Sequence, residues 1–181
     1  MEKYITFWMI MIEKMKIRMC DKMIIEYEDK YIEEVRDLLV ELEEYIVSID
    51  KDELDIVGED YREKYIVNLL NEVNENNGKI YLDIEDNRVV GMIAGAIRKY
   101  SEEDRLDYKC PKAGVVLELV TTQKERSKGI GRKLLNKIEE YFKTLDCEYV
   151  YIDVFAYNEN AKRFYEKSDY HARMHTYIRK I

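Results

Sequence analysis

The sequence has few cysteines and histidines, and this shortage excludes two kinds of protein. Cys20, Cys110 and Cys147 are the only cysteines among 181 residues, and their spacing is irregular. An odd, irregular set provides neither a disulfide framework nor the paired spacing of a zinc site. His171 and His175 have no cysteine near them in the sequence, so the sequence predicts no metal site. We therefore expect a protein of a reducing compartment, the cytoplasm, that holds no metal.

The sequence also lacks an excess of basic charge and any apolar run of membrane length. Its net charge is −8, whereas a protein that neutralises nucleic-acid phosphates needs a basic surface. The apolar run at residues 4–12 is much shorter than the roughly 20 residues of a membrane-spanning helix, and no small-residue cleavage site follows it. We expect no nucleic-acid partner, no membrane span and no secretory signal.

Length and apolar content predict a single domain. A chain of 181 residues, 46% of them apolar, can bury one proper core but not two. We place this domain at residues 23–181 and treat residues 1–22 as an N-terminal extension of uncertain structure. Loose attachment of the extension and packing of it on the core both remain open.

The periodicity of apolar residues predicts an α/β fold. Apolar residues repeat at helical spacing from Val35 to Ile46, where acidic residues form an expected solvated face, and again over residues 59–76. Hairpins produce antiparallel neighbours and crossover helices produce parallel ones, so we expect a mixed, mostly antiparallel central sheet with helices on both faces. The predicted strands are residues 23–27, 79–85, 88–98, 114–121, 148–155 and 174–181, with later helices at 130–144 and 160–167.

The most informative motif joins the strand at 114–121 to the helix at 130–144. Gly129 and Gly131 stand where that helix begins, and glycine lets the backbone approach a bulky phosphate. The first N–H groups of a helix lack internal partners, and the helix dipole adds positive charge there. These features predict a phosphate site, although an ordinary turn and helix cap also fit two glycines. Nearby basic residues are Arg126, Lys128, Arg132 and Lys133.

The motif differs from two common phosphate-binding sequences. It is not a P-loop, because the Gly-Lys-Ser/Thr of that motif is absent. The dinucleotide fingerprint needs a third glycine near the start of a Rossmann domain. Asp153 does lie about twenty residues downstream, where that fingerprint has an acidic residue, so a dinucleotide-binding domain remains an alternative.

The motif resembles the signature of the GNAT superfamily of acetyl-CoA-dependent N-acetyltransferases, which is Gln/Arg-x-x-Gly-x-Gly/Ala between a strand and a helix. Arg126, Gly129 and Gly131 fill its three specified positions. Many members carry a second motif, an asparagine followed seven residues later by a tyrosine, and Asn158 and Tyr165 match it. The resemblance covers about residues 23–181, and this region is similar to the ribosomal-protein alanine N-acetyltransferases.

The resemblance implies a site for acetyl-CoA as co-substrate and assigns residues to it. Leu119, Val120 and Thr121 would offer backbone groups to the pantetheine arm, and Asn158 would bond the arm from the other side. Asp169-Tyr170 and Gln123-Lys124-Glu125 depart from the commoner family residues and leave the substrate side less defined. The segment that would hold the pyrophosphate consists of Arg126, Ser127, Lys128, Gly129, Ile130, Gly131 and Arg132.

Three residues are candidates for the proton transfers. The resemblance makes Tyr165 the donor to the departing thiolate, and a phenol with a pKa near about 10 is protonated at neutral pH. Glu118 is a candidate base because it lies in an apolar run, where a charge is costly unless it faces a cleft or a partner. Asp153 is the second candidate, since it matches a catalytic glutamate of the alanine acetyltransferases. Either carboxylate could instead pair with a nearby basic side chain.

The predicted activity is direct acetyl transfer to a primary amine of a small molecule or a peptide terminus. The alternative is a non-catalytic module of the same fold that binds acyl-CoA as a sensor or partner subunit. The sequence does not decide the acceptor or the oligomeric state, for which a homodimer is one alternative.

Overall fold

The computed structural model describes residues 23–181, and the N-terminal extension lies outside the described residues. The strands are β1 (Met23–Glu26), β2 (Lys79–Glu85), β3 (Arg88–Ile97), β4 (Ala113–Thr121) and β5 (Tyr149–Ile152). The helices are η1 (Asp29–Tyr31), α2 (Ile32–Ile49), α3 (Tyr61–Glu75), α4 (Asp104–Asp107), η2 (Gln123–Glu125), α5 (Ile130–Thr144) and α6 (Glu159–Glu166).

The five described strands form one sheet in the order β1-β2-β3-β4-β5. The first four pair antiparallel, and β5 pairs parallel to β4, so the predicted mixed, mostly antiparallel sheet is confirmed. The β2–β3 turn has positive φ at both Asp86 (50°) and Asn87 (59°), the geometry of a tight hairpin. The β4–β5 pairing runs only from Ala113 to Val116 of β4. Residues 117–121 of β4 continue beyond it without a described strand on that side.

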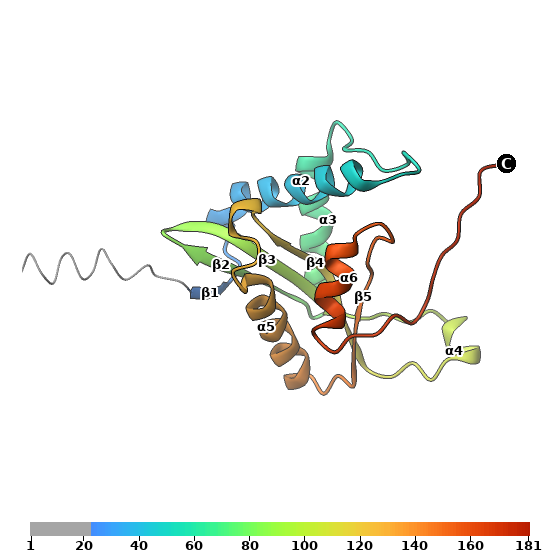
Figure 1. Cartoon of the computed structure of the whole chain (residues 1–181). Helices are drawn as coiled ribbons and strands as arrows, with labels where there is room; N and C mark the ends of the chain where they lie inside the picture. The colour runs from blue at the N-terminus through green and yellow to red at the C-terminus, as the bar shows by residue number, and fades with distance from the viewer. Residues whose placement is uncertain (1–22) are drawn as a thin grey trace, which may run out of the picture.

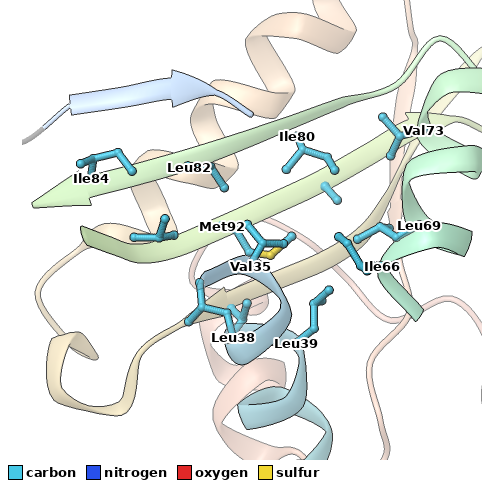
Figure 2. Packing of buried hydrophobic residues seen from close by; sticks show 13 residues of the cluster. Val35, Leu38, Leu39, Ile66, Leu69, Val73, Ile80, Leu82, Ile84 and Met92 are labelled. Atoms are coloured by element: carbon cyan, nitrogen blue, oxygen red, sulfur yellow. The ribbon is translucent and has the colours of Figure 1, made fainter. Parts of the chain in front are cut away.

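Helices cover both faces of the sheet, as the periodicity predicted (Figure 1). On one face, α2 and α3 contribute apolar side chains to a core with β2 and β3 (Figure 2). On the other face, α5 lies across the sheet with one apolar stripe buried. The buried residues of α5 are Ile130, Leu134, Leu135, Ile138 and Phe142.

Close packing of α5 on β4 fixes where the loop between them lies. The ring of Phe142 presses against the backbone of Gly114, and a Cβ added at Gly114 would lie 2.4 Å from Cδ2 of that ring. Only a residue without a side chain fits at this contact. This contact holds the C-terminal part of α5 against the beginning of β4, while Ile130 and Leu134, near the start of α5, pack closely on Gly91 of β3.

Two strand predictions require correction. The strand predicted at residues 148–155 is formed only at Tyr149–Ile152, because the chain turns away after its short pairing with β4. The strand predicted at residues 174–181 was wrong, since the described chain forms no strand after β5. Its apolar residues have the composition of a strand, but a strand also needs a neighbour to complete its hydrogen bonds.

Substituting Gly114 with alanine tests the packing of α5 on β4. The added methyl group would overlap the ring of Phe142, so Gly114→Ala should lower the free energy of unfolding by about 1–3 kcal/mol in urea denaturation. Gly58→Ala is the matched control, because a Cβ at Gly58 meets no atom within 4 Å. The control should change stability by less than about 0.5 kcal/mol. Equal effects of the two substitutions would contradict the packing argument.

Candidate active site

The loop between β4 and α5 turns through two left-handed residues. Ser127 has φ of 65° and Gly129 has φ of 83°, and Gly129 is the N-cap of α5. The space beside Gly129 is open, since a Cβ built there would meet no heavy atom within 4 Å. The next residue, Ile130, is buried and anchors the helix. The loop is thus an exposed turn that leads directly into a buried residue at the start of α5.

The backbone amides of this loop are unoccupied by the protein. The first helical bond of α5 runs from the N–H of Lys133 to the carbonyl of Gly129, at 3.2 Å. Within residues 23–181, no acceptor bonds the N–H groups of residues 127–132. Unpaired amides at a helix N-terminus favour an anion, because their partial positive charges add to the helix dipole. The segment predicted to hold the pyrophosphate therefore presents free amide donors at a helix N-terminus.

Arg126 fastens this loop to the rest of the protein. Its Nε donates to the carbonyl of Thr121 at 3.4 Å, and its guanidinium lies 5.1 Å from the ring centre of Tyr45. Its Nη2 is also 3.6 Å from Glu41, whose carboxylate accepts a bond from the N–H of Gln123 at 2.8 Å. Arg126 and Glu41 together tie the loop to β4 and α2.

The other two basic residues of the predicted segment are also engaged. Lys128 pairs with Glu125 at 2.6 Å. Arg132 donates from Nη2 to the carbonyl of Lys167 at 2.5 Å, and its guanidinium lies 5.9 Å from the ring centre of Phe164. Arg132 thus links the beginning of α5 to the end of α6. The backbone amides, rather than these side chains, are the free groups of the loop.

The second sequence motif lies beside the first. Asn158 is the N-cap of α6, where its Oδ1 accepts from the N–H of Ala161 at 3.0 Å. A Cβ built at Gly131 of α5 would lie 3.5 Å from the ring of Phe164 in α6. The two helices that carry the motifs therefore lie close together here. Asn158 therefore has a structural role as a cap, which leaves its Nδ2 group without a described partner.

Tyr165 is largely buried, yet its hydroxyl is free of the protein. Its ring packs edge-on against Phe164 and Tyr170, with centroids 5.1 and 5.9 Å apart. No described residue accepts or donates a hydrogen bond at its hydroxyl. Burial and, secondarily, the charge of Glu118 raise the pKa of Tyr165 well above its ordinary value of 10.0. Tyr165 is accordingly a protonated phenol near Glu118.

Glu118 lies on the part of β4 that extends beyond the β5 pairing. Burial raises the pKa of its carboxyl from 4.5 to about 7. The hydroxyl of Tyr65 donates to the carboxylate and opposes this rise, while the charge of Glu43 adds to it. A carboxyl with a pKa near neutrality can both accept and release a proton at neutral pH.

Three further residues of this site were not found by sequence reasoning. Tyr61 stacks on Tyr65 with ring centroids 4.7 Å apart and planes 16° from parallel. The Tyr61 hydroxyl donates to Glu43 at 3.3 Å, and burial raises the pKa of Glu43. The acidic residues between Val35 and Ile46 are expected to form a solvated face. Glu43 is half-buried instead, which corrects that prediction at this residue. The sequence spacing could have indicated these residues. Glu43 stands one helical turn after buried Leu39 and so lies on the same side of α2, and Tyr61 and Tyr65 are one turn apart and so lie on the same side of α3.

The remaining predicted residues are on the surface. Asp153 follows the end of β5, is exposed, and has no hydrogen bond or ion pair with another described residue. His171 and His175 are also exposed. In the described part of the chain, no group of three or more histidine, cysteine or acidic residues is placed to hold a metal ion. None of the helices between residues 23 and 181 is long and apolar enough to cross a membrane.

The fold and the loop define the class of this protein. A mixed sheet whose parallel pair ends beside an open helix N-terminus is the acyl-CoA N-acyltransferase fold that the two motifs implied. The sequence model of the acetyltransferase (GNAT) family matches residues 32–170. The protein belongs to the acetyltransferase (GNAT) family.

Solved structures share this fold at low sequence identity. A mutant protein from Bacillus halodurans is 18% identical, with a TM-score of 0.76 and coverage of 88% of this chain and 99% of its own. An acetyl transferase from Pyrococcus furiosus is 23% identical, with a TM-score of 0.67 and the same coverages. Glucosamine-6-phosphate N-acetyltransferase from Arabidopsis thaliana is 20% identical, with a TM-score of 0.58 and coverages of 88% and 97%. A search of curated proteins finds no match.

The raised pKa of Glu118 predicts a dependence of stability on pH. Its folded-state pKa of about 7 exceeds the ordinary 4.5, so unfolding releases a proton between these values and stability falls as the pH rises. Glu118→Gln removes this contribution. Between about pH 5 and pH 8, the wild type should lose about 2–3 kcal/mol of unfolding free energy more than Glu118→Gln does. Glu44→Gln, at an exposed position of α2, should follow the wild type. Parallel curves for the wild type and Glu118→Gln would show that Glu118 is not buried as described.

Proposed function

We propose that this protein transfers an acetyl group directly from acetyl-CoA to a primary amine. The observation that carries the proposal is the row of unoccupied amides at residues 127–132, which follows β4, the strand that bears Glu118, after the short helix η2. The proposed anion site and Glu118, a carboxyl with a pKa of about 7, thus lie on α5 and β4, which one short connection joins. A phosphate-bearing acetyl donor and an amine acceptor are the two substrates that this pair of groups suits.

The amides of the loop before α5 and the unpaired side of β4 together suit coenzyme A. The amides of residues 127–132 would hold the pyrophosphate. Leu119, Val120 and Thr121 belong to the part of β4 without a described neighbour on the β5 side, so their backbone could bond the amides of the pantetheine arm as an added strand would. The Nδ2 group of Asn158 would donate from the opposite side. Acetyl-CoA supplies the activated acetyl group as a thioester.

The chain's own residues would handle the protons of the transfer. Glu118 would take one proton from the bound ammonium, which frees the nitrogen lone pair. That nitrogen forms a bond to the acetyl carbon while the carbon–sulfur bond breaks, and backbone N–H groups of β4 would stabilise the carbonyl oxygen as it becomes negative. Tyr165 would give its proton to the sulfur, and the second proton that the nitrogen loses as the amide forms would return to the Tyr165 phenolate. Asp153 remains the second candidate for the base, at an exposed position just after β5.

The acceptor side of the proposed site is acidic and aromatic. Glu43 and Glu118 carry the carboxylates, and each accepts a hydrogen bond from one tyrosine of the stacked pair Tyr61 and Tyr65. Carboxylates and tyrosine faces both attract an ammonium group. This lining suits a cationic primary amine, whether it belongs to a small molecule or to a peptide terminus.

A panel of amines tests the activity and the role of Tyr165 together. We expect acetyl-CoA to release free thiol in the presence of at least one class of primary amine. Tyr165→Phe should lower the turnover number about 100-fold while changing the affinity for acetyl-CoA little, because only the proton donor is lost. Tyr100→Phe removes a hydroxyl that bonds the carbonyl of Pro111 in a distant loop and should retain activity. Binding of acetyl-CoA without turnover on any amine would instead support a non-catalytic acyl-CoA-binding module.

Gly129→Glu tests the phosphate site by itself. The added carboxylate would stand in the open space beside the unpaired amides and repel the pyrophosphate, at a position whose left-handed backbone also disfavours a side chain. Acetyl-CoA should no longer raise the melting temperature of this variant, whereas Gly58→Glu should respond as the wild type does. Undiminished affinity in Gly129→Glu, or stronger stabilisation of the wild type by NAD or ATP than by acetyl-CoA, would refute the proposed site.

A further inference from the structure

Glu118 lies on the face of the sheet that α2 and α3 cover, and an extra residue in β4 accompanies this placement. Val116 and Glu118 pair with consecutive residues of β3, so Leu117 between them has no partner of its own. Such a bulge changes the direction of the side chains that follow it. Val120 shares a face with Glu118, two residues earlier, and packs in the core beneath α2 and α3. The carboxyl of Glu118 is thereby brought to the side chains of α3.

The hydroxyl of Tyr65, on α3, bonds one of the two oxygens of this carboxyl. It donates to Oε1 of Glu118, which stands 53 residues away in the sequence. Within residues 23–181, no side chain bonds the other oxygen, Oε2, and no basic group pairs with the carboxyl. The two oxygens therefore differ: the protein holds Oε1, and Oε2 is left for a bound ammonium group.

Tyr65 is itself held in place by its surroundings. Its ring stacks on that of Tyr61, with the centroids 4.7 Å apart and the planes 16° from parallel. Tyr61 is fixed in turn by the hydrogen bond from its hydroxyl to Glu43 of α2, at 3.3 Å. The ring of Tyr65 also packs against the core beneath α2 and α3. A side chain that is restrained in this way presents its hydroxyl in one position, as the precise orientation of a reacting group requires.

Titratable groups of three elements face Glu118, and Tyr65 differs from the others in its effect. Burial is the largest cause that raises the pKa of Glu118, and the charge of Glu43 on α2 adds to it. Tyr61 of α3 and Tyr165 of α6 stay protonated, because burial and the nearby negative charge raise the pKa of each. Among these groups, the Tyr65 hydroxyl alone lowers the pKa of Glu118. It therefore favours the ionised carboxylate that a base must be before it accepts a proton.

We propose that Tyr65 is a positioning residue for the acetyl transfer, which holds Oε1 of Glu118 and leaves Oε2 as the oxygen that takes the proton from the acceptor ammonium. The inference rests on the proposed function, because it assigns a role within the same site. In this step one nitrogen–hydrogen bond of the ammonium breaks and an oxygen–hydrogen bond forms at Oε2. Tyr65 keeps its own proton throughout, since burial and the charge of Glu118 raise its pKa far above the ordinary 10.0.

The pH dependence of kcat/KM in Tyr65→Phe tests this role. Phenylalanine keeps the stacked ring and loses the hydroxyl, so the pKa that governs the acid side of the profile should rise by about one unit. Activity should then be about fivefold below the wild type at pH 7 and close to it above about pH 9.5. The control is Tyr141→Phe, which loses a hydroxyl bonded to the carbonyl of Asn77 at 2.8 Å and should keep the wild-type profile. A loss of the same factor at every pH would indicate a structural role and overturn the inference.

Titration of the Glu118 side chain separates this inference from the proposed function. The carboxyl carbon of Glu118 is followed by ¹³C nuclear magnetic resonance in the full-length protein without substrates. It should titrate near pH 7 in the wild type and about one unit higher in Tyr65→Phe. An active wild type whose titration and pH profile are unchanged by Tyr65→Phe would overturn the role of Tyr65 alone. A wild type that acetylates no amine at any pH would refute the proposed function, and the role of Tyr65 with it.

Discussion

The structure of this site depends on one mismatch, in which β4 is longer than the strand beside it. The parallel pairing with β5 ends at Val116, while β4 continues to Thr121 and leads into a helix whose first amides have no partner. A run of amides without protein partners at the beginning of a helix favours an anion, because the helix dipole adds to their partial positive charges. The contact of Gly114 with Phe142 holds α5 against β4 at the end away from the site, and the packing of Ile130 on Gly91 of β3 holds the beginning of α5 in place.

The electrostatic character of the site follows from burial. Glu118 would be an ordinary carboxylate on a surface strand, but the side chains around it raise its pKa to about 7. The Tyr65 hydroxyl opposes this rise by donating to the carboxylate, whereas the charge of Glu43, which accepts a hydrogen bond from Tyr61, adds to it. The negative charge of Glu118 helps to keep Tyr165 protonated. A proton acceptor and a proton donor with well-separated pKa values thus arise from one environment, which is a frequent property of acid–base sites.

The sequence predicted the parts of the fold that local pattern determines. The hairpin at Asp86-Asn87, the helix that begins after Gly129 and the mixed sheet all follow from turn chemistry and apolar spacing. Sequence did not predict which side chains meet across elements, because the contact of Tyr65 with Glu118 joins positions 53 residues apart. It also could not show that Arg126 and Arg132 are engaged by neighbouring groups rather than free. The failed prediction of a strand at residues 174–181 has a different cause, since a pattern records the strand's own residues and not the presence of a partner.

The proposed function depends on binding of the pyrophosphate of acetyl-CoA by the unpaired backbone amides of residues 127–132. Amide chemical shifts of the labelled full-length protein during titration with acetyl-CoA test it most directly, because each N–H group reports on its own hydrogen bond. The largest shifts should fall on residues 127–132 and on Leu119 to Thr121, and NAD should not reproduce them. Unchanged amides in these segments at saturating acetyl-CoA, or their largest shifts with NAD instead, would contradict it.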